Sequence, residues 1–288
     1  MYSAEINRNH RACLLLLIDQ SFSMSEPWAG TESSKSHALA QAVNKLLGNA
    51  TLLCSKGDER VNDYFEVGVL GYGADVASVL HGSNSARPLV PIGELARQPM
   101  RVDEILRKVP DGAGGIMQLP MKLPVWVDPS NNGKTPMVQA LREADRITRA
   151  WCANNSSNFP PIVINITDGV STDGDPTEAA ESLRSTGTDD GRTLLFNLHL
   201  SANPVQISAL PNTSSGLPDA HAVRLFEMTS ELPSVLLEAA SSIGYNVQPG
   251  SRGFLYNADA TSMIEFLDIG TRAVTPTGLR ELTSGKPS

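Results

Sequence analysis

Runs dominated by apolar residues alternate along this chain with segments in which apolar residues recur at helical spacing. Four such runs fall at residues 12–18, 64–73, 160–169 and 193–201. Strands that are apolar on both faces are typical of parallel sheets covered by helices, so each run predicts a buried strand. The apolar positions within 38–47 and 137–151 instead follow the spacing of a helix that buries one face.

With a short strand at 76–80 and a capped helix beginning near Asp175, these elements alternate as β-α-β-β-α-β-α-β. This alternation predicts an α/β fold, a doubly wound and mostly parallel sheet with helices on both faces. We expect the strand order 3-2-1-4-5-6, in which the first and fourth strands are neighbours where the order reverses. Ligands of such sheets bind beyond the carboxyl ends of the strands at this point.

Residues 81–132 interrupt the alternation, because they are rich in proline and glycine and have weak periodicity. We predict an insertion here, with a helix at 102–109 and a strand near 124–127. Three further elements are predicted in the last third, namely a helix at 235–243, a strand at 253–257 and a short helix at 263–267.

The domain prediction is a single domain over residues 1–272, with the insertion at about 81–132. A C-terminal elaboration at about 205–272 belongs to the same domain. Residues 273–288 are rich in Pro, Gly, Thr and Ser, which predicts a flexible tail.

Composition and charge narrow the classes of partner. The chain has 288 residues, of which 41% are hydrophobic, and a formal net charge of −8 without a dense Lys/Arg block, which disfavours nucleic acid. No apolar run approaches the ~20 residues that span a bilayer, so no membrane partner is expected. Three cysteines, none in a CxxC pair, indicate neither a disulfide framework nor a cysteine zinc site. These features favour a cytoplasmic protein.

Oxygen-bearing side chains follow two of the predicted strands. The first strand ends at Asp19, and Ser21 and Ser23 follow at alternate positions, so all three can point to one side of an extended turn. Asp168 stands at the end of a later strand, and Thr135 opens the helix before that strand. The expected strand order brings these five residues to one point. Hard oxygen ligands suit Mg²⁺ best, with Mn²⁺ or Ca²⁺ as alternatives.

Three segments carry a family resemblance. DQSFS at 19–23, GKTPM at 133–137 and ITDGVSTDGD at 166–175 resemble the metal-ion-dependent adhesion site of a von Willebrand factor A (VWA) domain. The resemblance covers about residues 10–205 and is greatest to bacterial intracellular VWA proteins, including tellurite-resistance-associated ones. It implies that Ser21 and Ser23 bind the metal directly. It also implies that Thr135, Asp19 and Asp168 bind the metal directly or through water.

The resemblance also implies a function. In such domains an acidic side chain of a partner protein completes the coordination of the metal. The expected function is therefore a non-enzymatic, metal-dependent protein interaction module. Members of the group act beside a protein kinase and a PP2C-type phosphatase, which makes these two the candidate partners and signalling or stress response the expected setting.

Two positions depart from the family pattern. Phe22 replaces the glycine that often separates the two serines, and Gln20 stands where glycine or threonine is frequent. Phe22 either lies exposed beside the metal, as an apolar contact for the partner, or folds back into the core.

Each candidate residue also has a structural interpretation. Thr135 can serve as a helix N-cap, and Asp168-Gly169 can be a simple turn. We predict that Asp175 caps a helix and that Asp173 braces the preceding turn, so neither is a predicted ligand. Glu26 is predicted to be a solvated loop residue.

Two alternative functions stay open. A metal-dependent phosphohydrolase would use Asp19 as nucleophile, but Ser21 stands where such an enzyme has a second aspartate. The other alternative is a structural subunit with a degenerate metal site, for which Phe22 is the argument.

Overall fold

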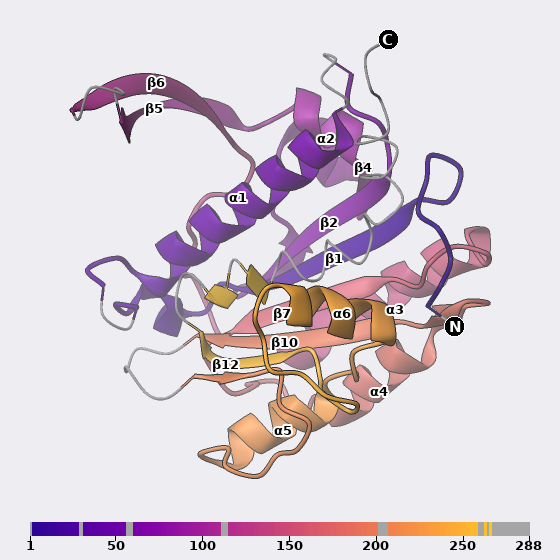
Figure 1. Cartoon of the computed structure of the whole chain (residues 1–288). Coiled ribbons are helices and arrows are strands. Elements are labelled where there is room, and N and C mark those ends of the chain that lie inside the picture. Colours follow the sequence, from indigo (N-terminus) through magenta and orange to yellow (C-terminus); the bar gives the residue numbers. More distant parts are fainter. Residues whose placement is uncertain are drawn as a thin grey trace.

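A mixed sheet of eight strands forms the centre of the molecule (Figure 1). The computed structural model describes residues 2–28, 31–55, 60–110, 115–200, 207–258, 262–263 and 265–266. Five mutually parallel strands form the middle of the sheet, in the spatial order β2 (Phe65–Tyr72), β1 (Ala12–Asp19), β7 (Ile162–Thr167), β10 (Leu194–Leu200) and β12 (Phe254–Ala258). Short antiparallel strands border them, with β3 (Val76–Ser78) and β4 (Val90–Pro91) on β2, and β11 (Ser208–Ala209) on β12.

The predicted fold class and strand order are confirmed. Strands β3, β2, β1, β7, β10 and β12 follow one another across the sheet, which is the order 3-2-1-4-5-6 when they are counted along the chain. The order reverses between β1 and β7, where Ile18 lies opposite Ile166. Asp19 and Asp168 therefore leave neighbouring strands at the same edge of the sheet.

Helices cover both faces of the sheet (Figure 1). One face packs against α1 (Lys35–Cys54), α2 (Ile92–Arg97) and α6 (Ser234–Ser242). The other packs against α3 (Met137–Asn154), α4 (Thr177–Ser185) and α5 (Ala220–Met228). Strand β1 supplies both layers, since Leu14 and Leu16 face the first and Leu15 and Leu17 the second. Full burial of each leucine contributes about 1.5–3 kcal/mol, which explains the unbroken apolar run.

The insertion contains a long hairpin that projects from the sheet (Figure 1). Strands β5 (Arg101–Pro110) and β6 (Ile116–Val125) pair antiparallel from Arg101↔Val125 to Pro110↔Ile116. The helix predicted at 102–109 is therefore wrong. Its apolar spacing fits a helix over only two turns, and pairing with β6 overrides so short a pattern. The strand predicted near 124–127 marks only the end of β6.

The base of this hairpin is fixed by buried polar contacts. The Asn44 side chain on α1 accepts from the backbone N–H groups of Trp126 and Val127, and donates to the Val127 carbonyl. The Trp126 indole donates to the Leu95 carbonyl on α2 at 2.8 Å. A short helix, η2 (Gly82–Ala86), completes the described part of the insertion.

Several smaller elements were not predicted. They include helices α2 and α5, the short helix η2, strands β4 and β11, and the two-residue strands β8 (Gly187–Thr188) and β9 (Gly191–Arg192). The predicted tail at 273–288, and part of the predicted helix at 263–267, lie outside the described residues. Among the helices that the structure describes, none combines the length and the apolar character needed to cross a bilayer.

Candidate metal-binding site

Asp19 anchors the candidate site at the end of β1. Its side chain is buried, and both of its oxygens accept hydrogen bonds: Oδ1 from the Ser21 N–H at 2.8 Å and Oδ2 from the Thr167 hydroxyl at 2.7 Å. The first bond turns the chain sharply out of the strand, as aspartates commonly do through a local backbone bond. The second ties Asp19 to the neighbouring strand β7.

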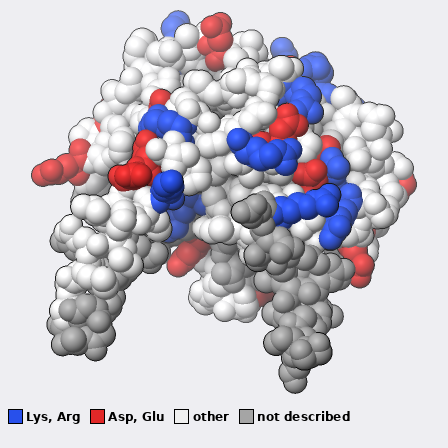
Figure 2. All heavy atoms as spheres, turned by 90° about the horizontal axis from the view of Figure 1, so that it is seen from above, with Lys and Arg blue, Asp and Glu red and all other residues white. Residues whose placement is uncertain are grey.

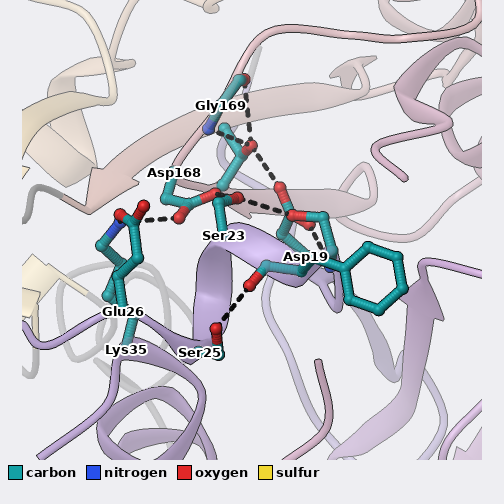
Figure 3. Close-up of polar contacts among 10 residues, drawn as sticks. Asp19, Ser23, Ser25, Glu26, Lys35, Asp168 and Gly169 are labelled. Atoms are coloured by element: carbon teal, nitrogen blue, oxygen red, sulfur yellow. Dashed lines mark hydrogen bonds and ion pairs between the residues drawn. The ribbon is translucent and has the colours of Figure 1, made fainter. Parts of the chain in front are cut away.

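Ser21 and Ser23 link Asp19 to Asp168 through hydrogen bonds. After the turn the chain forms a short helix, η1 (Phe22–Ser25). Ser21 Oγ lies 3.0 Å from Ser23 Oγ, and the Ser23 hydroxyl donates to Asp168 Oδ1 at 2.7 Å (Figure 3). The structure thus joins four of the five predicted site residues in one hydrogen-bonded chain across the β1–β7 boundary.

Thr135, the fifth predicted residue, lies beside this chain. It is buried, and its backbone N–H donates to the Thr172 hydroxyl while its carbonyl accepts from the Thr172 N–H, at 3.0 and 2.9 Å. A Cβ added to Gly169 would lie 3.9 Å from Thr135 Oγ1, which places the hydroxyl next to the Asp168-Gly169 turn.

The N-cap interpretation of Thr135 is wrong, because Asp173 performs that role from another loop. Helix α3 follows Pro136, and no side chain at the cap position bonds its amides. The Asp173 carboxylate instead accepts from the N–H groups of Val138 and Gln139 at 3.1 and 2.9 Å. The Thr135 hydroxyl is thereby left for another function. Asp175 caps α4 as predicted, since its carboxylate accepts from the Thr177 N–H at 3.0 Å.

A glycine allows the Thr135 loop to approach the rest of the site. Gly133 has φ +126°, and a Cβ there would come within 2.3 Å of the Ala74 nitrogen, so only glycine fits. Its carbonyl accepts from the Phe22 N–H at 2.9 Å. The loop before α3 is thus held against both η1 and the turn after β2.

Lys35, which the sequence did not indicate, adds a buried positive charge. It is the first residue of α1, and its side chain is 4% exposed. Its Nζ donates to Asp168 Oδ2 and to Glu26 Oε2, both at 2.8 Å (Figure 3). Burial favours a lower pKa for Lys35, but the hydrogen bonds and charges of Asp168 and Glu26 outweigh it and raise the pKa. The lysine therefore stays charged and neutralises part of the negative site.

Glu26 is exposed, as predicted, but it is not merely solvated. It bonds Lys35 from the outside, so Lys35 lies between one buried and one exposed carboxylate. Both oxygens of Asp168 thus accept a hydrogen bond, one from Ser23 and the other from Lys35.

The electrostatics of Asp19 favour a bound cation. Burial raises the pKa of Asp19 to about 6, and the nearby charge of Asp168 adds to the rise, while hydrogen bonds from Thr167 and Ser21 oppose it. Burial removes water from the ionised carboxylate and the hydrogen bonds within the protein do not fully replace it, so its negative charge is incompletely balanced. A divalent cation would supply the balancing positive charge.

The donor set fits a hard divalent cation. Within the described residues no three His, Cys, Asp or Glu side chains are grouped so that they could hold a metal. The site instead combines two carboxylates with the hydroxyls of Ser21, Ser23 and Thr135. Such all-oxygen sets suit Mg²⁺, Mn²⁺ or Ca²⁺ rather than softer metals.

Phe22 lies on the surface of η1, between the two serines. Phe22 is 68% exposed. Of the two alternatives for Phe22, the structure therefore favours the exposed one.

No protein-family model matches the sequence, and no curated protein is similar enough to match it. Among solved structures, proximal thread matrix protein 1 from the mussel byssus has 13% identity and a TM-score of 0.49, covering 94% of this chain and 49% of its own. A von Willebrand factor type A protein from Catenulispora acidiphila has 13% identity and a TM-score of 0.47, covering 92% of this chain and 43% of its own. This chain thus spans less than half of either protein.

A second structure of the mussel protein has zinc in its MIDAS motif, the metal-ion-dependent adhesion site. It has 13% identity and a TM-score of 0.49, covering 94% of this chain and 49% of its own. The conserved hypothetical protein BatB from Bacteroides thetaiotaomicron has 12% identity and a TM-score of 0.40, covering 91% of this chain and 98% of its own. The α/β fold class of the present chain follows from its own strand order.

Proposed function

We propose that this chain is a metal-dependent protein interaction module of the VWA type. The observation that carries the proposal is the hydrogen-bonded chain Asp19–Ser21–Ser23–Asp168 at the reversal of strand order. The three resembling sequence segments converge on this point, as the resemblance requires.

In this proposal the metal is held directly by Ser21 and Ser23, with Thr135, Asp19 and Asp168 bound directly or through water. The metal supplies a Lewis-acidic positive charge to which an aspartate or glutamate of a partner binds. The neutral hydroxyls leave most of that charge unquenched, which favours an anionic group from outside. Mg²⁺ is the proposed physiological ion.

A binding role suits Asp19 better than a nucleophilic one. Each of its oxygens accepts one hydrogen bond within the protein, which fixes the orientation of the carboxylate and leaves a second lone pair on each oxygen for a metal or its water. We therefore propose that the chain is not an enzyme. The exposed Phe22 ring is the proposed apolar contact beside the partner's carboxylate.

The cellular setting is proposed from the sequence resemblance alone. It supports a bacterial cytoplasmic adaptor that works with a protein kinase or a PP2C-type phosphatase, in signalling or stress response.

The proposal is tested by affinity capture from native extract with Mg²⁺ or with EDTA. Wild type and Asp19→Asn serve as baits, and Ser25→Ala is the matched control, since the Ser25 hydroxyl bonds only the Phe22 carbonyl in the described structure (Figure 3). A partner captured by wild type and Ser25→Ala with Mg²⁺, but lost with EDTA and with Asp19→Asn, is the expected result.

The captured partner is then purified and its exposed aspartates and glutamates are replaced one at a time. We expect one replacement to remove the Mg²⁺-dependent binding measured by calorimetry, and Phe22→Ala to weaken it about tenfold. Equal binding with Mg²⁺ and EDTA would contradict the proposal.

A further inference from the structure

A second polar site lies at the opposite end of the sheet from the metal-binding residues. A cavity of about 640 Å³ opens where β10 begins, lined by segments from α4, β9, the chain before α6 and the chain before β12. Its size is within the range of small-molecule sites in proteins. Three of its lining residues are arginines, namely Arg184, Arg192 and Arg252.

The structure describes no carboxylate within ion-pair distance of these arginines. In the described part of the chain none of the three forms an ion pair, although the exposed Glu181 and Glu231 also line the cavity. This differs from Arg101 and Arg146, which are exposed and paired. Guanidinium groups that line a cavity without an ion-pair partner lack their usual counter-charge.

Arg184 shows the electrostatic cost most clearly. Its Nε is buried without a hydrogen-bond partner among the described residues, and its terminal nitrogen reaches the Thr229 carbonyl only at 3.5 Å. Burial lowers the pKa of Arg184, and the positive charge of Arg252 lowers it further, while Glu181 opposes the change. The two guanidiniums are thus close enough for their charges to repel each other, and both reach the Thr229 carbonyl.

Arg252 is held in place by the fold. Its guanidinium donates to the carbonyls of Phe226, Glu227 and Thr229 at 3.1, 3.1 and 3.2 Å, and stacks 4.7 Å above the Phe226 ring. A side chain so fixed presents its charge to the cavity without further loss of conformational freedom.

Thr193 supplies an independent indication of a ligand. It is 1% exposed and lines the cavity, and its Oγ1 is buried without a hydrogen-bond partner among the described residues. A buried hydroxyl without a partner is unfavourable unless a ligand satisfies it.

We infer that this cavity binds the phosphate group of a small phosphorylated molecule, with Arg184, Arg192 and Arg252 around the phosphate oxygens and the Thr193 hydroxyl as a further donor. Arginine's planar fork matches phosphate oxygens, and a multiply charged anion relieves the repulsion among several guanidiniums. A cavity of this volume also holds the organic part of such a molecule.

Calorimetry on the full chain tests the inference, with inorganic pyrophosphate as probe and acetate as the carboxylate control. The titrations contain EDTA, so that binding is independent of the metal site and of the function proposed for it. We expect saturable binding of pyrophosphate and at least about tenfold weaker binding of acetate.

Two variants locate the site. Arg192→Gln removes an exposed charge and Thr193→Val removes a hydroxyl without changing the side-chain shape, and each is expected to weaken pyrophosphate binding about tenfold. Arg146→Gln, on the surface of α3, is the matched control and is expected to bind as wild type does. Pyrophosphate binding by Arg192→Gln and Thr193→Val at wild-type strength would overturn the inference, as would no binding to wild type or equal binding of acetate.

A thermal melt separates ligand recognition from damage to the fold. Because Thr193 Oγ1 has no described partner, Thr193→Val without ligand is expected to melt at or above the wild-type temperature. A stable variant that has lost pyrophosphate binding supports the inference. A Thr193→Val protein that melts well below wild type would show that the hydroxyl serves the fold and would overturn its role as a ligand donor.

Discussion

The two ends of the central sheet carry opposite charges, and they differ in how far other residues of the chain balance these charges. At the carboxyl ends of β1 and β7, buried carboxylates are bonded by hydroxyls and by Lys35. At the start of β10, three arginines line a cavity without a described carboxylate partner. The first site is partly neutralised by its own residues, whereas the second depends on an outside anion. Figure 2 shows Lys and Arg side chains interspersed with Asp and Glu side chains over one face of the molecule.

The internal neutralisation at the carboxyl end can be removed by Lys35→Met. This variant leaves the buried Asp168 carboxylate without its cation, which is expected to lower the metal-free free energy of unfolding by about 3–5 kcal/mol. Removal of the competing positive charge is expected to raise Mn²⁺ affinity about tenfold. Denaturant unfolding and calorimetry measure the two effects. Lys134→Met, an exposed lysine on the neighbouring loop, is the control, and a variant indistinguishable from it would contradict the role of Lys35.

The raised pKa of Asp19 predicts that the stability of the metal-free protein depends on pH. Its folded-state pKa of about 6 exceeds the ordinary 3.8, so the folded protein binds this proton more tightly than the unfolded chain. The resulting stability is fully present below about pH 4 and is lost as the pH rises through 6, a change of about 3 kcal/mol. We expect metal-free wild type to lose this much relative to Asp19→Asn between pH 4 and pH 7. Parallel stability profiles of the two proteins would refute it.

Replacement of Asp19 separates the two ends of the sheet. Asp19→Asn keeps the side-chain shape but removes the charge, and is expected to weaken Mg²⁺ and Mn²⁺ binding by at least about 100-fold. Pyrophosphate binding at the arginine cavity is expected to stay at the wild-type value. Calorimetry with each ion measures both, with Ser25→Ala as the control. A loss at both ends would mean that the substitution disturbs the whole sheet.

Asp173 distinguishes structural carboxylates from ligands at the same edge. Asp173→Ala removes the cap of α3 and is expected to cost about 1 kcal/mol of unfolding free energy. Metal affinity is expected to change less than about twofold, because Asp173 is not in the proposed ligand set. A loss of metal binding as large as that of Asp19→Asn would place Asp173 among the ligands.

The sequence predicted the parts of the fold that depend on long periodic segments. The strand order followed from the β-α alternation, and it in turn brought Asp19 and Asp168 to one edge. The serines were predictable because they follow Asp19 at alternate positions within one short loop. These residues are close in space because the chain itself is regular near them.

Residues that only the tertiary fold brings together left no such pattern in the sequence. Lys35 reads as an ordinary residue at the start of a helix, and its burial depends on the packing of α1 beside Asp168. The arginines at 184, 192 and 252 come from separate segments, and only the tertiary fold gathers them. The helix predicted at 102–109 failed for a related reason, since its pairing partner lies beyond the turn of the hairpin.

The projecting hairpin has a consequence for solubility. Most of its apolar side chains are exposed, with Leu106 at 65% and Ile116 at 71%. An exposed strand edge would normally invite extension of the sheet by another chain. Pro120 and Pro124 pair with Leu106 and Val102, so the N–H groups that they lack belong to the outer edge of β6. This edge therefore offers another chain no continuous row of backbone hydrogen-bond donors, and a neighbouring molecule meets the hairpin through its exposed side chains instead.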